Sequence, residues 1–101
     1  MTKSKTIGLI GMGDMGSAVA KFLLKSSFTV QTNLDGRSKK STENALKSNV
    51  QIVSFIKLIE SSDLIISIIP PISSAKTAKK ISAYSSKLSK SVNYLDANAI
   101  S

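Results

Sequence analysis

The 101-residue chain is long enough for one domain with a single modest core, and 42% of its residues are hydrophobic, which excludes a disordered chain. It contains no cysteine and no histidine, so disulfides, thiolate zinc sites and a histidine general base are excluded, and we predict no metal site. With 14 basic and 6 acidic residues the net charge is +8, which favours anionic partners such as nucleotides, although most lysines are better explained as solvated helix faces.

No apolar segment approaches the length of a membrane span. The longest strongly apolar run, residues 64–69, is far below the roughly 20 residues that a spanning helix needs. The lysines near the amino terminus precede a short apolar run that ends at once in glycines, which is unlike a signal peptide. We therefore expect no membrane association and, by default, a cytoplasmic protein.

Strand-like and helix-like segments alternate along the whole chain. In chain order, the pattern predicts a strand at residues 6–10, a helix at 14–25, a strand at 28–32, a helix at 38–48, a strand at 50–53, a helix at 54–61, a strand at 63–69, a helix at 73–88 and a strand at 92–95. The first helix is expected from the helical spacing of its apolar residues Met15, Val19, Phe22 and Leu23. The fourth strand is the clearest, because it is almost continuously apolar until two prolines end it.

The order of these segments predicts an α/β fold. Repeated strand–helix–strand units require parallel pairing and right-handed crossovers. A strand without polar alternation is buried on both faces, as in a parallel sheet. We therefore predict one Rossmann domain over residues 1–101, with a doubly wound parallel sheet of strand order 3-2-1-4-5. We expect this domain to be incomplete at its C-terminus, without the sixth strand.

A glycine-rich turn follows the first predicted strand and opens the first predicted helix. Its six residues spell G-x-G-x-x-G in the context that this dinucleotide-binding motif requires. Gly11 allows the tight turn, Gly13 lets the backbone approach a pyrophosphate, and Gly16 lets the helix pack closely on the sheet. Asp14 suits the helix dipole but not a bound anion, so we expect it to be a cap or to face solvent. The predicted cofactor-binding residues here are Gly11, Met12, Gly13, Met15 and Gly16.

The residues after the second predicted strand bear on the choice between NAD and NADP. An acidic residue at this point holds the ribose hydroxyls of NAD, whereas a basic residue accepts the 2′-phosphate of NADP. Asn33 carries no charge to repel a phosphate, Arg37 can bind one with two hydrogen bonds, and Ser38 adds a hydroxyl. These residues favour NADP. If Asp35 rather than Asn33 ends the strand, the preference returns to NAD.

Residues 7–16, 33–38, 63–71 and 96–101 together carry a resemblance to a known family. They resemble the β-hydroxyacid dehydrogenases, which include 6-phosphogluconate and 3-hydroxyisobutyrate dehydrogenases. The resemblance implies an NADP(H)-binding domain of an oxidoreductase that acts on a hydroxy acid. It also implies that the nicotinamide lies near Ile69 and Pro70, and that Asn98 and Ser101 approach the substrate.

The chain departs from this family in what it lacks. No lysine here matches the family's catalytic lysine, and the helical substrate domain has no counterpart, so we predict no catalytic residue in this chain. A missing substrate domain or a protein partner would then complete the site. The alternative is a non-catalytic nucleotide-binding module, or a subunit that a partner completes. Nucleic-acid binding is disfavoured, because the aromatic residues are few and unclustered.

Overall fold

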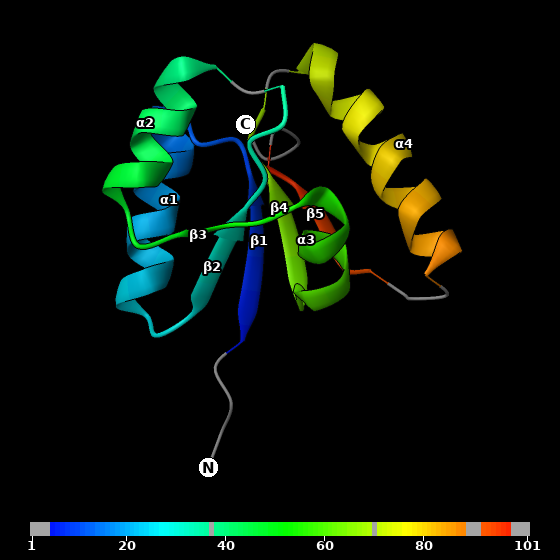
Figure 1. Ribbon diagram of the computed structural model, residues 1–101, viewed down its shortest axis with the longest axis horizontal. Helices are drawn as coiled ribbons and strands as arrows, with labels where there is room; N and C mark the ends of the chain where they lie inside the picture. Colours follow the sequence, from blue (N-terminus) through cyan, green and yellow to red (C-terminus); the bar gives the residue numbers. More distant parts are fainter. Residues whose placement is uncertain (1–4, 37, 70, 89–91, 98–101) are drawn as a thin grey trace.

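The computed structural model describes residues 5–36, 38–69, 71–88 and 92–97. In chain order the elements are β1 (Thr6–Ile10), α1 (Asp14–Lys25), β2 (Thr29–Thr32), α2 (Lys39–Lys47), β3 (Gln51–Ile52), α3 (Phe55–Ser61), β4 (Leu64–Ser67), α4 (Pro71–Lys87) and β5 (Tyr94–Asp96). The strands pair in parallel in the order β3-β2-β1-β4-β5 (Figure 1). The predicted α/β fold and its strand order are therefore confirmed.

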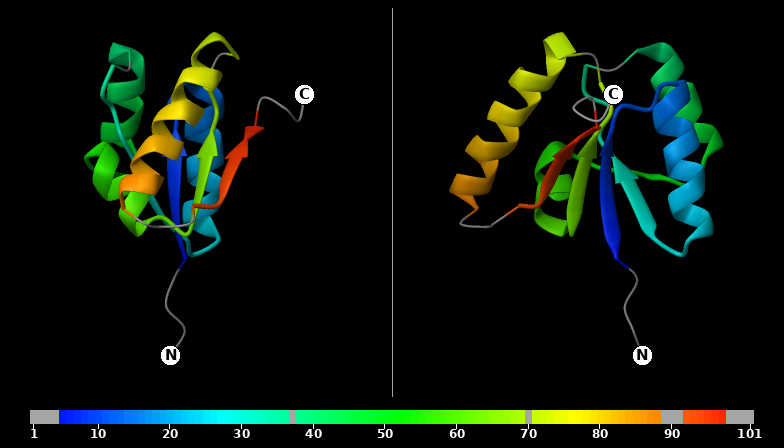
Figure 2. Two further views of the ribbon diagram at one scale, coloured as in Figure 1. Left: turned by 90° about the vertical axis from the view of Figure 1, so that its right-hand side faces the viewer. Right: turned by 180° about the vertical axis from the view of Figure 1, so that it is seen from behind.

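Helices cover both faces of the sheet, with α1 and α2 on one face and α3 and α4 on the other (Figure 1 and Figure 2). The buried cluster on the first face is formed by Leu9, Met12, Ala20, Val30, Ala45 and Val50. The cluster on the second face is formed by Ile10, Leu58, Ile59, Ile65, Ile69 and Ile81. Consecutive residues of β1 enter opposite clusters because side chains alternate across a strand. The central strand is thus buried on both faces, as its apolar sequence predicts.

Helix α3 packs unusually close to the sheet. A Cβ atom on Gly8 would lie 2.4 Å from Ser62 Oγ and 3.0 Å from the Leu58 side chain, so a larger residue at this point of β1 would force these side chains to move. On the neighbouring strand, the Gln31 amide nitrogen donates to the Leu58 carbonyl at 3.3 Å, to Ser61 Oγ at 2.8 Å and to Ser62 Oγ at 2.9 Å. Gln31 is buried and therefore anchors the end of α3 to β2.

Two of the predicted element boundaries need correction around the prolines. The fourth strand ends at Ser67 rather than at residue 69, and α4 begins at Pro71 rather than at residue 73. Proline is well suited to the first helical position, because its missing N–H would have no partner there and its φ is already helical. With 17 residues, α4 is the longest of the described helices, none of which is both long and apolar enough to cross a membrane.

The apolar spacing correctly predicts α1 but not which of its residues are buried. The buried residues of α1 are Gly16 and Ala20, while Val19 and Leu23 pack against the cluster from its edge. Met15 and Phe22 are 69% and 68% exposed. These two side chains lie seven residues apart, which places them on one side of the helix, away from the cluster.

The Gln31 anchor makes a prediction about stability. Replacing Gln31 with Met keeps the side-chain volume but removes the hydrogen bonds that join β2 to the end of α3, so we expect the free energy of unfolding to fall by about 1 kcal/mol. The matched control is Gln51→Met, because Gln51 is exposed on the short edge strand β3 and its replacement should change stability by less than about 0.5 kcal/mol. Urea denaturation followed by circular dichroism measures both. Equal losses in the two variants would contradict the anchoring role.

Candidate functional site

The candidate site lies where the strand order reverses, at the carboxyl ends of β1 and β4. These two ends are held side by side by the hydrogen bond from the Ile68 amide to the Ile10 carbonyl, at 2.7 Å. After β1 the chain continues into α1 on one face of the sheet, and after β4 it continues into α4 on the other face. In open parallel sheets, ligands bind in the crevice that forms at such a reversal.

Steric constraints at the turn after β1 explain two of its glycines. Gly11 has a φ of +105°, and a Cβ atom there would lie 2.1 Å from the Ile68 carbonyl oxygen. A Cβ atom on Gly16 would lie 1.8 Å from the Gly11 carbonyl oxygen. The sequence motif predicted that Gly16 allows close packing on the sheet. The closest approach is instead to the turn itself, so the first turn of α1 rests directly on the residue that follows β1.

The third glycine, Gly13, has no such steric role. A Cβ atom on Gly13 would have no heavy atom within 4 Å, and its φ of −69° is open to any residue. Gly13 is also the N-cap of α1, and no side chain caps this helix. By contrast, Ser38 caps α2 by accepting from the Ser41 amide, and Ser54 caps α3 by accepting from the Lys57 amide. The start of α1 therefore combines open space with backbone amides that no side chain caps, which is the arrangement that binds anions.

A cavity of about 340 Å³ lies against this turn. It is lined by Gly11, Gly13, Gly36, Ser38, Ser41, Ile68, Ile69 and Ser73. The structure thus brings together residues from the ends of β1 and β4, the start of α2 and the first turns of α4. Four of the predicted cofactor-binding residues line it: Gly11, Gly13, Ser38 and Ile69.

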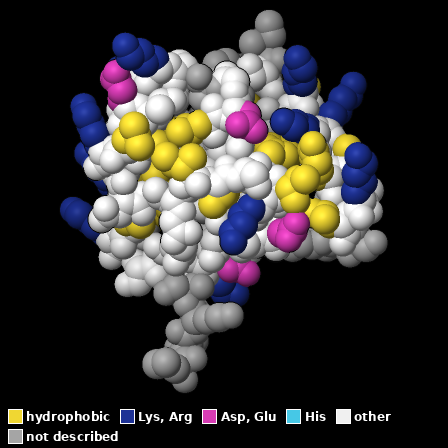
Figure 3. All heavy atoms as spheres, in the orientation of Figure 1, with side chains coloured by type: hydrophobic (Ala, Val, Ile, Leu, Met, Phe, Trp, Pro, Cys, Tyr) yellow, Lys and Arg dark blue, Asp and Glu magenta, His cyan; other side chains and the backbone are white. Residues whose placement is uncertain are grey.

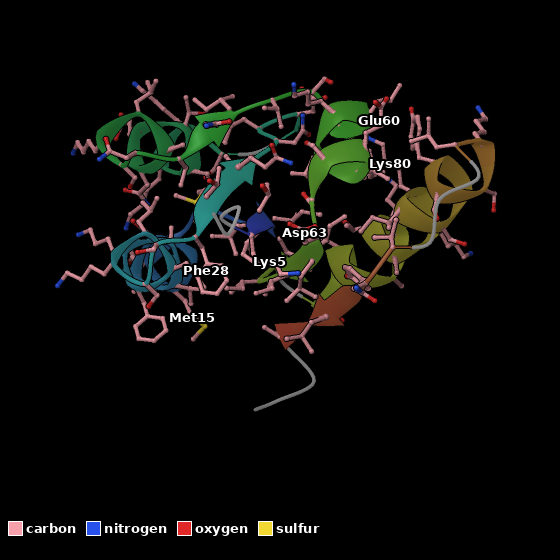
Figure 4. All side chains as sticks on the ribbon, turned by 90° about the horizontal axis from the view of Figure 1, so that it is seen from below. Lys5, Met15, Phe28, Glu60, Asp63 and Lys80 are labelled. Carbon is pink, nitrogen blue, oxygen red and sulfur yellow. The ribbon has the colours of Figure 1, made fainter. Side chains whose placement is uncertain are left out.

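A second cavity, of about 380 Å³, lies along the same edge of the sheet. It is lined by Ile10, Asn33, Asp35, Phe55, Lys76, Thr77 and Lys80. Both cavities are lined by residues at or after the carboxyl ends of β1, β2 and β4. They are therefore neighbouring parts of one edge of the sheet. Lys80 extends from α4 toward α3 (Figure 4), with its ammonium 4.3 Å from the centre of the Phe55 ring. The aromatic ring and the two lysines give this cavity an apolar wall with a cationic rim.

Asn33 and Asp35 share one small turn after β2. Strand β2 ends at Thr32. The side-chain nitrogen of Asn33, Nδ2, donates to the Val53 carbonyl at 2.9 Å. The Asn33 side-chain oxygen accepts from the Asp35 amide at 3.2 Å. Asn33, which is 7% exposed, therefore shapes the turn through both ends of its side chain, while Asp35 is exposed at the second cavity.

The two methionines predicted to bind the cofactor differ in their environments. The Met12 side chain is fully buried in the cluster under α1 and α2, so only its backbone is near the turn surface. Met15 points outward from α1 (Figure 4) and is largely exposed. Met15 is therefore available for contact with a ligand or another chain, whereas the Met12 side chain is available for neither.

Four residues named from the sequence lie outside the described part of the chain: Arg37, Pro70, Asn98 and Ser101. The neighbours of Arg37 on both sides, Gly36 and Ser38, line the first cavity. Within the described residues, no group of three or more acidic side chains that could hold a metal ion comes together.

Two contacts from α2 to the glycine turn were missed by the sequence analysis. The Lys40 ammonium lies 3.0 Å from one carboxylate oxygen of Asp14 and 3.1 Å from the other. One helical turn later, the Asn44 amide nitrogen donates to the Met12 carbonyl at 2.8 Å. The sequence predicted that Asp14 caps the helix or faces solvent and that Lys40 is solvated. Both side chains are indeed largely exposed, but they are paired with each other.

On the face that Figure 3 displays, basic side chains are spread over α2 and α4 and interspersed with acidic ones. They do not form one continuous basic patch on this face. The high net charge is therefore distributed along the helices, and only part of it lies beside the two cavities.

This chain resembles known proteins both in sequence and in structure. The family described as "D-isomer specific 2-hydroxyacid dehydrogenase, NAD binding domain" matches residues 1–95. An uncharacterized 28.5 kDa protein of Methanothermus fervidus, from the 5′ region of 7S RNA, is 36% identical over 96 residues, which are 94% of this chain and 36% of that protein.

Solved structures agree with this family match. A conserved protein of unknown function, reported as structurally similar to 3-hydroxyacid dehydrogenases, superimposes with a TM-score of 0.78 at 25% identity, covering 90% of this chain and 33% of its own. The apo-structure of D-lactate dehydrogenase from Escherichia coli superimposes with a TM-score of 0.53 at 27% identity, covering 66% of this chain and 20% of that enzyme. The chain thus spans about a third of the length of the first two proteins, and less of the third.

The different roles of the glycines can be separated by mutation. Gly13→Ala meets no steric obstacle, so we expect it to lower the free energy of unfolding by less than about 1 kcal/mol, the cost of alanine at an N-cap. It should nevertheless weaken dinucleotide binding by about tenfold or more, because its methyl group lies where a phosphate approaches the amides. Gly11→Ala, in contrast, should lower stability by at least about 1–3 kcal/mol, because of its positive φ alone. Thermal unfolding and a fluorescence titration with NADH distinguish the two effects. A Gly13→Ala variant that binds normally would contradict the placement of the pyrophosphate.

Proposed function

We propose a function from the premise that this chain belongs to the family of NAD-binding domains of D-isomer-specific 2-hydroxyacid dehydrogenases. The chain is the nicotinamide-dinucleotide-binding part of a hydroxyacid dehydrogenase-like protein. The proposal is that it prefers NADP(H) over NAD(H) and that it serves an oxidoreductase of the 6-phosphogluconate dehydrogenase type. The observation that carries it is the cavity between the uncapped start of α1 and the start of α2.

The residues present fit a dinucleotide. The pyrophosphate would lie at the start of α1, where Gly13 leaves open space and the helix dipole favours negative charge. The adenosine would extend toward the second cavity, where Phe55 and Thr77 offer an apolar surface and a hydroxyl group. Ile69, which is buried at the end of β4 and lines the first cavity, would border the nicotinamide. When bound, the cofactor supplies hydride transfer, and the residues of this chain hold and orient it.

The preference for NADP rests on the start of α2. Ser38 is exposed at the N-cap of α2 and lines the cavity, so an incoming 2′-phosphate would meet its side chain, whose oxygen also accepts from the Ser41 amide. Arg37 lies in sequence between two residues that line the same cavity, and its guanidinium can bind a phosphate with two hydrogen bonds. Asp35 opposes this preference, because a carboxylate repels a 2′-phosphate and can bind ribose hydroxyls instead. Its cavity also contains Lys76 and Lys80, which offset that charge.

A hydroxy acid as substrate is supported by similarity to two proteins. One is reported as similar to 3-hydroxyacid dehydrogenases, and the other is a D-lactate dehydrogenase. We place the substrate-binding and catalytic residues in the part of such proteins that this chain does not span, and in this proposal Asn98 and Ser101 lie on the substrate side of the cofactor.

A second candidate function, a nucleotide-binding module that a partner completes, is favoured by one observation. Met15 and Phe22 on α1 are large apolar side chains that remain mostly exposed, and Leu95 on the edge strand β5 is 40% exposed. Exposed apolar side chains of this size often mark contact surfaces. A substrate domain or a protein partner would cover them. Oxidation of a hydroxy acid by this chain alone would contradict this candidate.

The cofactor preference can be tested by titration of the purified chain with NADPH and NADH, followed by nucleotide fluorescence. We expect NADPH to bind more tightly. Arg37→Ala should weaken NADPH binding by about tenfold or more, because a bidentate pair with the 2′-phosphate is lost. The same variant should leave NADH binding within about twofold, because NADH lacks that phosphate.

The outcome opposed to this expectation is tighter binding of NADH by the unmodified chain. In that case Asp35→Asn should weaken NADH binding, because the carboxylate would then hold the ribose hydroxyls. If neither nucleotide binds to the folded chain, the glycine turn does not form a working cofactor site by itself, and the proposed function of the isolated chain is wrong.

A further inference from the structure

Helix α2 contacts the glycine turn with two side chains from one of its faces. Lys40 and Asn44 are four residues apart, so they project from α2 in nearly the same direction. Lys40 reaches the carboxylate of Asp14, in the first turn of α1, and Asn44 reaches the backbone carbonyl of Met12. The two contacts lie on either side of Gly13, the residue at which a pyrophosphate would approach.

We propose that Asn44 is a positioning residue that fixes the orientation of the Met12–Gly13 peptide. Beside it, Lys40 neutralises Asp14. Together these two contacts shape the turn for a pyrophosphate before the ligand binds. The inference rests on dinucleotide binding at this cavity and does not depend on the preference between NADP and NAD.

The peptide geometry explains why one hydrogen bond has this effect. In a trans peptide the carbonyl of one residue and the N–H of the next point in opposite directions. The Asn44 bond, at 2.8 Å, holds the Met12 carbonyl toward α2 and therefore directs the Gly13 N–H away from α2. This peptide rotates about the ψ of Met12 and the φ of Gly13, and Gly13 has no side chain to oppose the rotation on its side. Without Asn44, the peptide could turn its carbonyl oxygen, rather than its N–H, toward an anion.

Lys40 acts on charge rather than on shape. Asp14 lies in the first turn of α1, where its carboxylate favours the free helix but repels a bound pyrophosphate. The Lys40 ammonium is within 3.1 Å of both carboxylate oxygens. Because both side chains are largely exposed, this interaction is screened by solvent and salt, and it adds little to stability. Its proposed effect is on ligand binding, since it offsets the negative charge of Asp14 next to the proposed phosphate site.

The first test compares ligands with and without a pyrophosphate. Asn44→Ala in the full chain should weaken NADH and NADPH to the same extent, by about three- to tenfold, which is the effect of one hydrogen bond. Binding of adenosine 2′-monophosphate, which has no pyrophosphate, should remain within about twofold when followed by NMR chemical shifts. The matched control is Asn49→Ala, in the exposed loop after α2, which should bind all three ligands normally. A loss for all ligands, or no loss for the dinucleotides, would overturn the positioning role.

The second test separates the charge effect from the shape effect. Lys40→Met should weaken NADH binding at low ionic strength by about threefold, and the loss should disappear at about 0.5 M salt, where the screening length is only a few ångströms. It should also disappear in an Asp14→Asn background, because no carboxylate is then left to neutralise. The Asn44→Ala loss should persist at both salt concentrations. Lys47→Met, at the other end of α2, is the control for a general loss of positive charge. A Lys40→Met loss that survives in the Asp14→Asn background would overturn the neutralising role.

If NADH binds more tightly than NADPH to the unmodified chain, only the proposed cofactor preference fails. If Asn44→Ala leaves the binding of both dinucleotides unchanged, only the positioning role fails. The two outcomes are read from different comparisons, so neither can be mistaken for the other.

Discussion

The close approach of α1 to the turn after β1 is the constraint on which the rest of the site depends. A Cβ atom on Gly16 would meet the Gly11 carbonyl at 1.8 Å, and one on Gly11 would meet the Ile68 carbonyl at 2.1 Å. Backbone therefore packs on backbone at two successive points, from α1 to the end of β1 and from there to the end of β4. This packing brings the start of α1 to the edge of the sheet at the strand reversal. The position of the amides at the start of α1 is thus set by backbone packing at two glycines and not by polar contacts, and such amides can bind anions.

Helix α2 contributes to both ends of the site. Ser38 and Ser41 at its start line the cavity, while Lys40 in the same turn and Asn44 one turn later contact the glycine turn. The proposed positions of the ribose and of the pyrophosphate are therefore both next to residues of the same short helix. A ligand that binds at the start of α2 would meet a glycine turn whose orientation that helix already determines.

The sequence predicted the parts of the site that depend on local constraints. Gly11 and Gly16 are needed because the turn has no room for side chains at these two positions, and the spacing of the motif identifies Gly13 together with them. The strand order followed from the alternation of segments and the handedness of their connections. By contrast, the contacts from Lys40 to Asp14 and from Asn44 to Met12 join residues 26 and 32 positions apart. No local pattern marks such residues, because their roles arise only where α1 and α2 pack together.

The exposure of Met15 and Phe22 shows a related limit of periodicity. Helical spacing identifies an apolar stripe but does not say what covers it. In α1 the surface that meets the sheet is formed by small residues, Gly16 and Ala20, because the helix lies so close. Of the larger apolar residues, Val19 and Leu23 reach the cluster from its edge, whereas Met15 and Phe22 lie on the outer side. The apolar spacing thus predicts the helix but does not separate its buried residues from its exposed ones.

The proposed pyrophosphate and ribose positions depend on different chemical groups of the site. At the start of α1, where we propose that the pyrophosphate binds, the site presents backbone amides and the helix dipole, with the charge of Asp14 offset by Lys40. The ribose region instead presents side chains, with Asp35 exposed at one cavity and Ser38 at the other. Changes at residues 35–38 can therefore alter the choice between a 2′-hydroxyl and a 2′-phosphate without disturbing the backbone that holds the pyrophosphate. In the proposed function, one glycine turn would therefore serve either cofactor, and a few residues after β2 would decide the preference.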